Sequence, residues 1–390
     1  MKKLIFITLI LTLFVAMSAF GSNTRTLTMG NNNAIMVDDA NIWLFPSRIN
    51  NYPGLAIAEL ANNDVNRFGI HWQFGDDAPW VMATYFEDNL GTFTGHFGFT
   101  FGFTPPDDNR RIHWFYGRAM GTNKLGLRLS LYSSSEEFTD SSPASDKESF
   151  SYYDAHFGLT ADDDSWDLAL NLGFGTWTDE VGGVATFDAD GLYDFSVMGR
   201  VFMDRGPNYT YVPHAGIEYH KLGWKTPIPG PPVITLEEKR TAFVVNFGIG
   251  QIYTPSNNVE AVFDFGIMIE NEKYEFTDGT NTQENKDNTT TVPYFKIGLD
   301  AEVLSWMDVR FGATSFWQRT KDEIVTSAPF SSEDKNGFAD NETFLGFGFH
   351  WGNFHVDTYA DPQLFLEGLN FISGGQQDMN FQISAVYEML

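Results

Sequence analysis

Hydrophobic and polar residues alternate strictly along much of this chain. The stretch FTGHFGFTFGFT at 93–104 places five phenylalanines on one parity and no large apolar residue on the other. Alternation with a period of two predicts a β-strand with one apolar and one polar face. In a soluble sandwich the apolar face would pack into a core, whereas in a membrane barrel it would face lipid.

The same pattern predicts twelve strands from Lys124 onward. Most of them run for about nine to thirteen residues, the length that a tilted strand needs to cross a bilayer. Strands of soluble proteins are shorter, about five or six residues on average. The predicted ranges are 124–132, 151–159, 166–177, 192–203, 209–222, 241–253, 259–275, 292–303, 309–320, 343–351, 354–359 and 379–389.

The region before Lys124 offers five further strand candidates, at 55–60, 68–74, 80–86, 93–103 and 112–118. Single-chain outer-membrane barrels have an even number of strands. We therefore predict an all-β fold, a transmembrane antiparallel up-and-down β-barrel of about 14 strands, with 16 as the alternative count.

The connections between these strands alternate between short and long. Tight turns on the periplasmic side and extended loops outside the cell are typical of outer-membrane barrels. The sequence therefore also predicts the orientation of the barrel. The short turns lie at 161–165, 204–208, 254–258, 304–308 and 352–353, and the long polar connections at 133–149, 223–239, 277–290 and 321–342.

In the apolar, strictly alternating parts of the predicted strands, charged residues fall on the polar parity. A charge that faced lipid near the bilayer midplane would cost about 2–4 kcal/mol, so these side chains are expected to face the lumen. The predicted lumen-lining residues are Arg128, Asp167, Asp194, Arg200, Glu218, Asn246, Glu260, Asp264, Lys296, Asp300, Glu302 and Arg310.

The N-terminus has the form of a secretory signal peptide. Lys2 and Lys3 precede an apolar run at 4–20, which is followed by small residues, so we assign 1–21 to the signal. Its removal leaves 22 basic against 51 acidic residues, a balance that excludes a nucleic-acid partner. The chain has no cysteine and must be held together by hydrogen bonds and packing alone.

The segment MGNNNAIMVDDANIWLFPSRINNYPGL, at 29–55, resembles the N-terminal region of FadL-type (OMPP1/FadL/TodX) outer-membrane transporters for hydrophobic compounds and of PorV-like barrels. Asp38, Asp39, Ala40 and Pro46 match the pattern of that region, whereas Phe45 departs from it. The C-terminal region at 356–390 is also similar to the end of such barrels.

This resemblance implies that the N-terminal residues fold into the lumen as a hatch. A disordered tail would instead leave the apolar residues at 42–45 in water. We therefore expect a hatch or plug at 22–53, with Asp38, Asp39, Ala40 and Pro46 as its motif, and an outer-membrane β-barrel at 54–390.

The sequence contains no motif that recommends an enzyme. It has no G-x-S-x-G elbow, no P-loop and no dinucleotide-binding glycine motif, so we expect no catalytic residue and no cofactor. His350 and His355 lie across the tight turn at Gly352 and would share a face, as zinc ligands do, but we interpret them as polar residues of the lumen or its rim and expect no metal site.

The resemblance and the strand pattern together predict passive uptake of small, hydrophobic or amphipathic molecules across the outer membrane of a diderm bacterium. A general diffusion porin is one alternative, and a secretion or assembly barrel with a protein partner, as in PorV-like proteins, is another. The expected partners are outer-membrane lipids and a small-molecule permeant.

Overall fold

A computed structural model describes most of the chain. The predicted signal peptide at 1–21 and the phenylalanine-rich strand candidate at 93–103 lie outside the described residues. These are 23–61, 66–73, 80–88, 110–138, 146–181, 184–228, 234–277, 282–326, 331–360 and 381–389.

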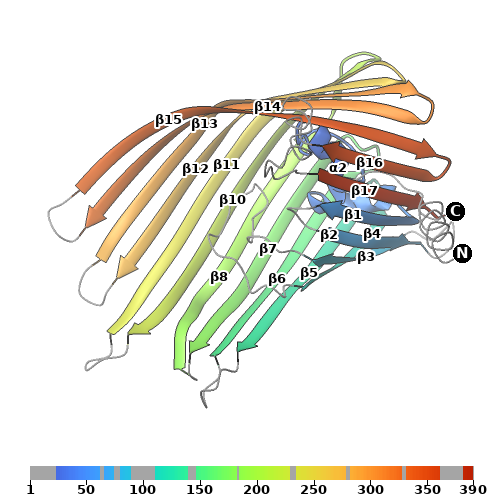
Figure 1. Ribbon diagram of the computed structural model, residues 1–390. Helices are drawn as coiled ribbons and strands as arrows, with labels where there is room; N and C mark the ends of the chain where they lie inside the picture. The colour runs from blue at the N-terminus through green and yellow to red at the C-terminus, as the bar shows by residue number, and fades with distance from the viewer. Residues whose placement is uncertain are drawn as a thin grey trace, which may run out of the picture.

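The strands form one closed antiparallel barrel (Figure 1). Each strand pairs with its neighbours in the chain, and β17 pairs with β1. The sheet has 17 labelled strands, but β8 and the two-residue β9 both pair with β10 and together make one wall strand, so the wall has 16. The bounds are β1 Leu55–Ala61, β2 Asn66–Trp72, β3 Trp80–Asp88, β4 Arg110–Met120, β5 Asn123–Phe138, β6 Asp146–Ala161, β7 Trp166–Val181, β8 Val184–Val201, β9 Met203–Asp204, β10 Tyr209–Ile228, β11 Ile234–Ser256, β12 Val259–Thr277, β13 Thr282–Leu304, β14 Met307–Thr326, β15 Ser331–Trp351, β16 Phe354–Ala360 and β17 Phe381–Glu388.

The structure confirms the predicted fold class, with 16 strands rather than 14. All twelve strands predicted after Lys124 are present, and β1 to β4 precede them. The first three of these four have only 7 to 9 residues, and such short runs of alternation do not by themselves separate a wall strand from a loop. The strand pattern alone therefore left 14 and 16 as alternative counts.

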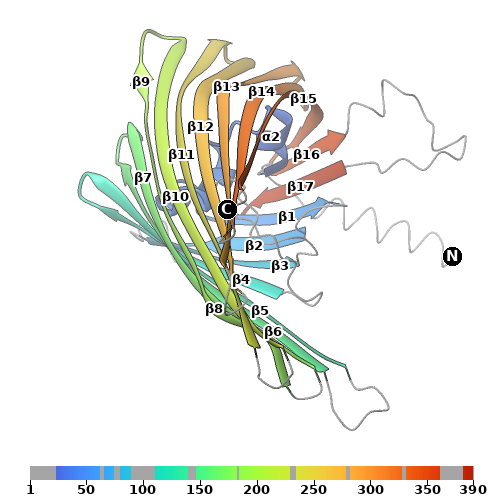
Figure 2. The same ribbon diagram turned by 90° about the vertical axis from the view of Figure 1, so that its left-hand side faces the viewer.

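Strand length divides the barrel into a tall and a short side (Figures 1 and 2). β11 and β13 each have 23 residues, whereas β1 and β16 have 7. The tight turns lie at one end of the barrel, here called the turn end, together with Leu55 and its partner Glu388, where the wall begins and closes. The tall strands continue toward the opposite end, here called the extended end. The turns lie at 121–122, 162–165, 205–208, 257–258, 305–306 and 352–353.

Much of the sequence predicted as long polar connections is strand in the structure. β12 and β13 remain paired up to Thr277 and Thr282, although the connection was expected to span 277–290. Both faces of these extensions are polar, so the hydrophobic alternation that marks the membrane-crossing part is absent there. Backbone pairing and cross-strand ion pairs hold them instead, as between Lys273 and Glu284 at 2.7 Å.

Apolar side chains cover the outward face of the wall. Phe247 on β11, for example, is 59% exposed, and comparable side chains follow on the neighbouring strands. An apolar surface of this extent is unfavourable in water and matches the lipid-facing band of a membrane barrel. Members of this band are Phe68, Trp114, Leu129, Leu168, Leu172, Phe174, Ile217, Phe243, Phe247, Ile249, Phe263, Phe265, Phe295, Leu299 and Phe311.

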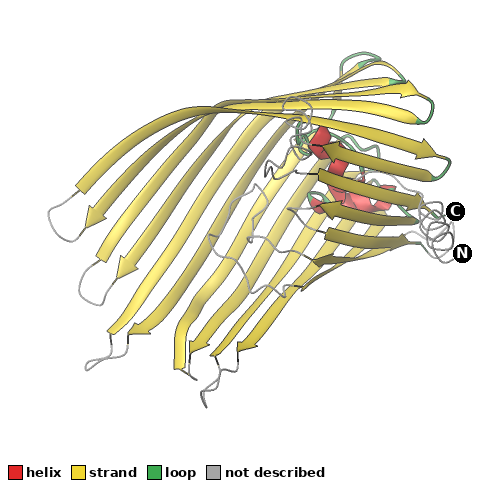
Figure 3. Cartoon of the chain, viewed as in Figure 1, coloured by secondary structure: helices red, strands yellow, loops and turns green. Residues whose placement is uncertain are grey.

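The residues at 23–52, here called the plug, lie inside the barrel at its turn end (Figure 3). They form helix α2 (Asn23–Thr28) and two 3-10 helices, η1 (Asp39–Trp43) and η2 (Pro46–Asn51). α2 contacts β14 to β17, and η2 contacts β3 to β6, so the plug reaches two separate parts of the wall. None of the helices in the described residues is long and apolar enough to cross a membrane.

Candidate functional site in the plugged lumen

Local sequence explains the two short helices of the plug. Asp38 is the N-cap of η1, and its side chain accepts a hydrogen bond from the backbone N–H of Ala40 at 3.1 Å. In turn, the side-chain oxygen of Asn41 accepts a hydrogen bond from the backbone N–H of Asp38. Pro46 occupies the first position of η2. A backbone N–H at that position has no partner within the helix, so the missing N–H of proline costs no hydrogen bond. The four residues of the predicted hatch motif are all buried.

Inward-facing glycines allow the plug backbone to approach the wall closely. A Cβ atom at Gly126 on β5 would lie 2.1 Å from the carbonyl carbon of Pro46, and one at Gly312 on β14 would lie 2.2 Å from the backbone nitrogen of Gly30. Any larger residue at these two positions would overlap the plug. The wall is therefore shaped to hold this segment.

A buried charge cluster joins the plug to β7 and β8. Arg48 of the plug and Arg200 of the wall both bond the carboxylate of Asp167, at 2.8 and 2.7 Å, and all three side chains are fully buried. Arg200 also donates to the plug carbonyl oxygens of Ala34 and Met36, at 3.1 and 2.7 Å. Separating the members of such a cluster would leave a buried charge without a partner. The cluster therefore holds the plug in one register against the wall.

A second charge cluster lies at the other side of the plug. Arg25 of α2 is 3.0 Å from Glu260 and 3.1 Å from Asp300. Asp300 also accepts from Arg310 at 3.0 Å, and Arg310 in turn bonds Asp357. Two predicted lumen residues thus contact a plug arginine that the strand pattern did not single out, and a third, Arg310, joins the cluster through Asp300.

Two cavities open beside the plug at the turn end, with volumes of about 770 and 670 Å³. Arg25, Asp300, Asp308 and His350 line both of them. Carboxylates outnumber arginines in each lining, so the local potential is negative and favours cations over anions.

The structure places most of the predicted lumen residues on the buried face, and their part in a permeation path stays a prediction. Arg128 pairs with Asp154 at 2.8 Å and donates to the carbonyl oxygen of Trp43 at 3.0 Å. Glu302 differs from the others because it is exposed beside the turn at 305–306. Arg128, Asp167, Asp194, Arg200, Glu218, Asp264 and Arg310 are buried, and Asn246, Glu260, Lys296 and Asp300 are half-buried.

Sequence reasoning missed several inward-facing partners of these residues. They share the polar parity of their strands, which is the signal that would have found them, and half of them are histidines, which were not counted with the charges. Arg25 and Arg48 lie in the plug, where no strand parity applies. The missed wall residues are Glu59, His71, Glu87, His113, Asp154, His156, His214, His220, Asp308 and Asp357.

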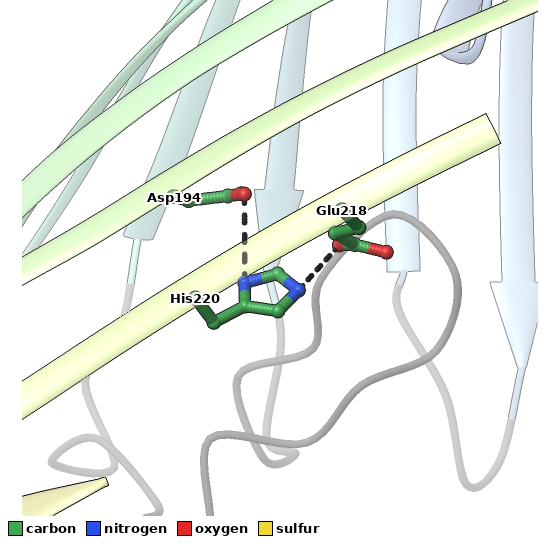
Figure 4. A group of neighbouring side chains, drawn as sticks. All are labelled: Asp194, Glu218 and His220. Atoms are coloured by element: carbon green, nitrogen blue, oxygen red, sulfur yellow. Dashed lines mark ion pairs between the residues drawn. The ribbon is translucent and has the colours of Figure 1, made fainter. Parts of the chain in front are cut away.

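Asp194, Glu218 and His220 form a buried cluster of potential metal ligands, with ligand atoms within 4.8 Å of one another (Figure 4). Asp194 lies 3.5 Å from Nδ1 of His220, and Glu218 lies 2.7 Å from Nε2. The two carboxylates therefore flank opposite nitrogens of one ring. A single ion cannot use both nitrogens, so this geometry suits an imidazole that bridges two carboxylates better than it suits a metal centre.

Inward-facing aromatic rings form a continuous track from the plug toward the extended end. Trp43 of η1 contacts His113 with ring centroids 4.9 Å apart, His113 contacts Tyr132 at 5.6 Å, and Tyr132 contacts Tyr152 at 5.3 Å, all edge to face. The track ends in a buried apolar cluster, here called the aromatic cluster. Its members are Tyr132, Phe150, Tyr152, Leu192, Leu222 and Ala242, with Trp177 and Trp224 packed against them.

The ionisation of Asp39 in the plug is strongly perturbed by its surroundings. Its side chain is only 3% exposed, and its Oδ2 atom has no hydrogen-bond partner among the described residues. Burial raises the pKa of Asp39 well above the ordinary value for aspartate, and the neighbouring carboxylate of Asp38 raises it further. The plug therefore contains a carboxyl group that favours its neutral form.

Comparisons with known proteins give structural likenesses without sequence similarity. No protein-family model matches the chain, and no curated protein matches its sequence. The fold is similar to a TodX deltaS2S3 mutant monoaromatic hydrocarbon channel, at 9% identity and a TM-score of 0.43, over 95% of this chain and 99% of that one. It is also similar to the ferric yersiniabactin uptake receptor FyuA from Yersinia pestis, at 7% identity and a TM-score of 0.38, over 86% and 80% of the two chains.

Proposed function

We propose that this chain is an outer-membrane transporter for small amphipathic or hydrophobic molecules, closed at its turn end by the plug. The observation that carries the proposal is the aromatic track, which leads from the aromatic cluster to Trp43 of the plug. The lipid-facing band on the outward face supports the location in a membrane. The turn end faces the periplasm in this proposal.

Apolar and aromatic side chains are what a site for such molecules requires, with a few polar groups to orient the ligand. The cluster supplies both, because Tyr152 donates to Asp194 at 3.2 Å within the same region. A molecule with an apolar body and a hydroxyl, amine or amide group would find contacts for each part.

The contacts between the plug and the wall favour this proposal over a permanently open diffusion pore. The plug is bonded to the wall through Arg25, Arg48 and Arg200, and its backbone touches wall glycines. Passage through the turn end therefore requires the plug to move, and a bound permeant that favours the moved state would shift that equilibrium.

The test compares two phenylalanines on strand β6 that lie on opposite faces. Phe150 is inward and 1% exposed, whereas Phe157 is outward and 42% exposed. Purified wild-type protein should bind small amphipathic aromatic compounds in equilibrium dialysis and admit them into proteoliposomes. Phe150→Ala should weaken binding about tenfold or more, because a buried aromatic side chain contributes several kcal/mol of contact.

Phe157→Ala is the matched control and should leave binding unchanged, since its ring faces lipid. Equal binding by wild-type protein and Phe150→Ala would contradict the proposed site. Binding of such compounds by no variant at all would contradict the proposed class of permeant.

A further inference from the structure

Two histidines face each other directly across the tight turn between β15 and β16. His350 and His355 are partners in the antiparallel register, so their side chains lie on the same face of the hairpin. Their ring centroids are 4.5 Å apart, with planes at 82°. Nδ1 of His350 and Nδ1 of His355 point at each other and are in contact. The pair thus brings two nitrogen atoms of the same kind to one point.

The second nitrogen of His350 is held by a carboxylate. Nε2 of His350 contacts Oδ2 of Asp308, on the neighbouring strand β14. An ionised carboxylate only accepts hydrogen bonds, so the ring proton belongs on Nε2 and Nδ1 presents its lone pair to His355. Histidines that bind metals have this arrangement, in which a carboxylate fixes the tautomer and makes the ring more basic.

Space and charge next to the pair also suit a cation. Both histidines line the cavity of about 670 Å³ at the turn end, which leaves room for water molecules on the metal. The lining includes two arginines, Arg25 and Arg310, and six carboxyl groups, among which that of Asp39 favours its neutral form. The carboxyl groups are those of Asp38, Asp39, Asp300, Asp308, Asp357 and Glu388.

We propose that His350 and His355 bind a divalent transition-metal ion, Cu²⁺, Ni²⁺ or Zn²⁺, at the turn end of the barrel. Imidazole nitrogen suits these ions, whereas Mg²⁺ and Ca²⁺ require oxygen ligands. Two nitrogens leave the remaining positions to water. Among the three ions Cu²⁺ should bind most tightly, following the general order of stability of divalent complexes. The inference does not depend on the proposed transport function.

The test uses metal-stripped, full-length protein in detergent, purified without a histidine tag. Binding of Cu²⁺ and Zn²⁺ is measured by equilibrium dialysis with elemental analysis, and Cu²⁺ is also examined by electron paramagnetic resonance. We expect one bound ion and a hyperfine pattern from two nitrogens. His350→Asn and His355→Asn should each weaken Cu²⁺ binding at least tenfold. Asp308→Asn should weaken it by about tenfold, as for other residues that orient metal ligands.

His220→Asn is the control, because His220 belongs to a separate histidine–carboxylate cluster, with Asp194 and Glu218. It should bind Cu²⁺ as wild-type protein does. Heat-modifiable mobility on gels verifies that each variant is folded. Undiminished binding in folded His350→Asn and His355→Asn would overturn the proposal, as would loss of binding in His220→Asn alone. Unchanged binding in Asp308→Asn would overturn the orienting role given to that carboxylate.

Discussion

The two ends of the lumen differ in the kind of contact they make. At the turn end, the plug packs apolar side chains such as Ile42 against the wall, and buried ion pairs and backbone contacts at wall glycines, as at Asp167 and Gly126, add directional contacts to this packing. Toward the extended end, the inward face changes to the aromatic cluster around Tyr152. Ion pairs and hydrogen bonds are directional and fix one register, whereas apolar contact tolerates ligands of varied shape. In the proposed function, the turn end holds the protein's own chain and the aromatic cluster accepts the permeant.

Removing the plug should have the largest effect on the difference between the two ends of the lumen. Deletion of 31–51 should leave the wall folded, because each wall strand is paired with wall neighbours on both sides. It should raise single-channel conductance in planar bilayers severalfold, since the turn end would lose the segment that fills it. Heat-modifiable gel mobility is the control for folding. Unchanged conductance in the folded deletion variant would mean that the plug does not obstruct the lumen.

Removal of one plug cation should loosen the turn end while leaving the chain complete. Arg48→Ala removes one of the two arginines that bond Asp167, and because Arg200 still pairs with that carboxylate, we expect a cost of about 1.5–3 kcal/mol, the range for hydrogen bonds to charged groups. Hydrogen exchange of the η2 amides should become faster, with little change in the wall. Arg205→Ala, at an exposed turn, is the matched control and should change stability by no more than about 0.5 kcal/mol. Protection of η2 that equals the wild type would show that this cluster does not retain the plug.

A smaller effect should come from the buried carboxyl of Asp39. Because its pKa is raised in the docked plug, its contribution to docking is full below the ordinary pKa and is lost as pH rises through the raised value. Asp39→Asn cannot ionise, so at pH 7.5 it should protect η1 amides from exchange better than wild type, by about 1–3 kcal/mol. At pH 4 the two proteins should be equal after correction for intrinsic exchange rates. A difference that is the same at both values of pH would exclude ionisation of Asp39 as the cause.

The sequence predicted the wall far better than the way the lumen is filled. Alternation with a period of two placed every strand after Lys124, because each strand has one face in lipid and one in the lumen. The polar extensions were missed as strands because neither of their faces is apolar. Backbone hydrogen bonds between the paired strands hold these extensions together, and such bonds do not depend on a pattern of hydrophobic residues.

Pairings within the lumen could not be predicted for a related reason. Parity places Asp167 and Arg200 on the inward face but does not say that Arg48, more than a hundred residues earlier, bonds the same carboxylate as Arg200. The contact between His350 and His355 was foreseeable from the short turn at Gly352. The role of Asp308 beside them depends on strand register, which only the structure gives.

The central claim is that the plug must leave its place for a molecule to pass. Ser47 Oγ of the plug and Thr160 Oγ1 of the wall are 2.7 Å apart, and the chain has no cysteine, so Ser47→Cys with Thr160→Cys offers a specific disulfide lock. Uptake of the amphipathic aromatic compounds into proteoliposomes is then measured with the pair oxidised and reduced, with cross-linking verified by mass spectrometry. Our account predicts that the oxidised protein admits nothing, that reduction restores uptake, and that neither single variant responds to oxidation. Equal uptake by the fully cross-linked and reduced forms would contradict it.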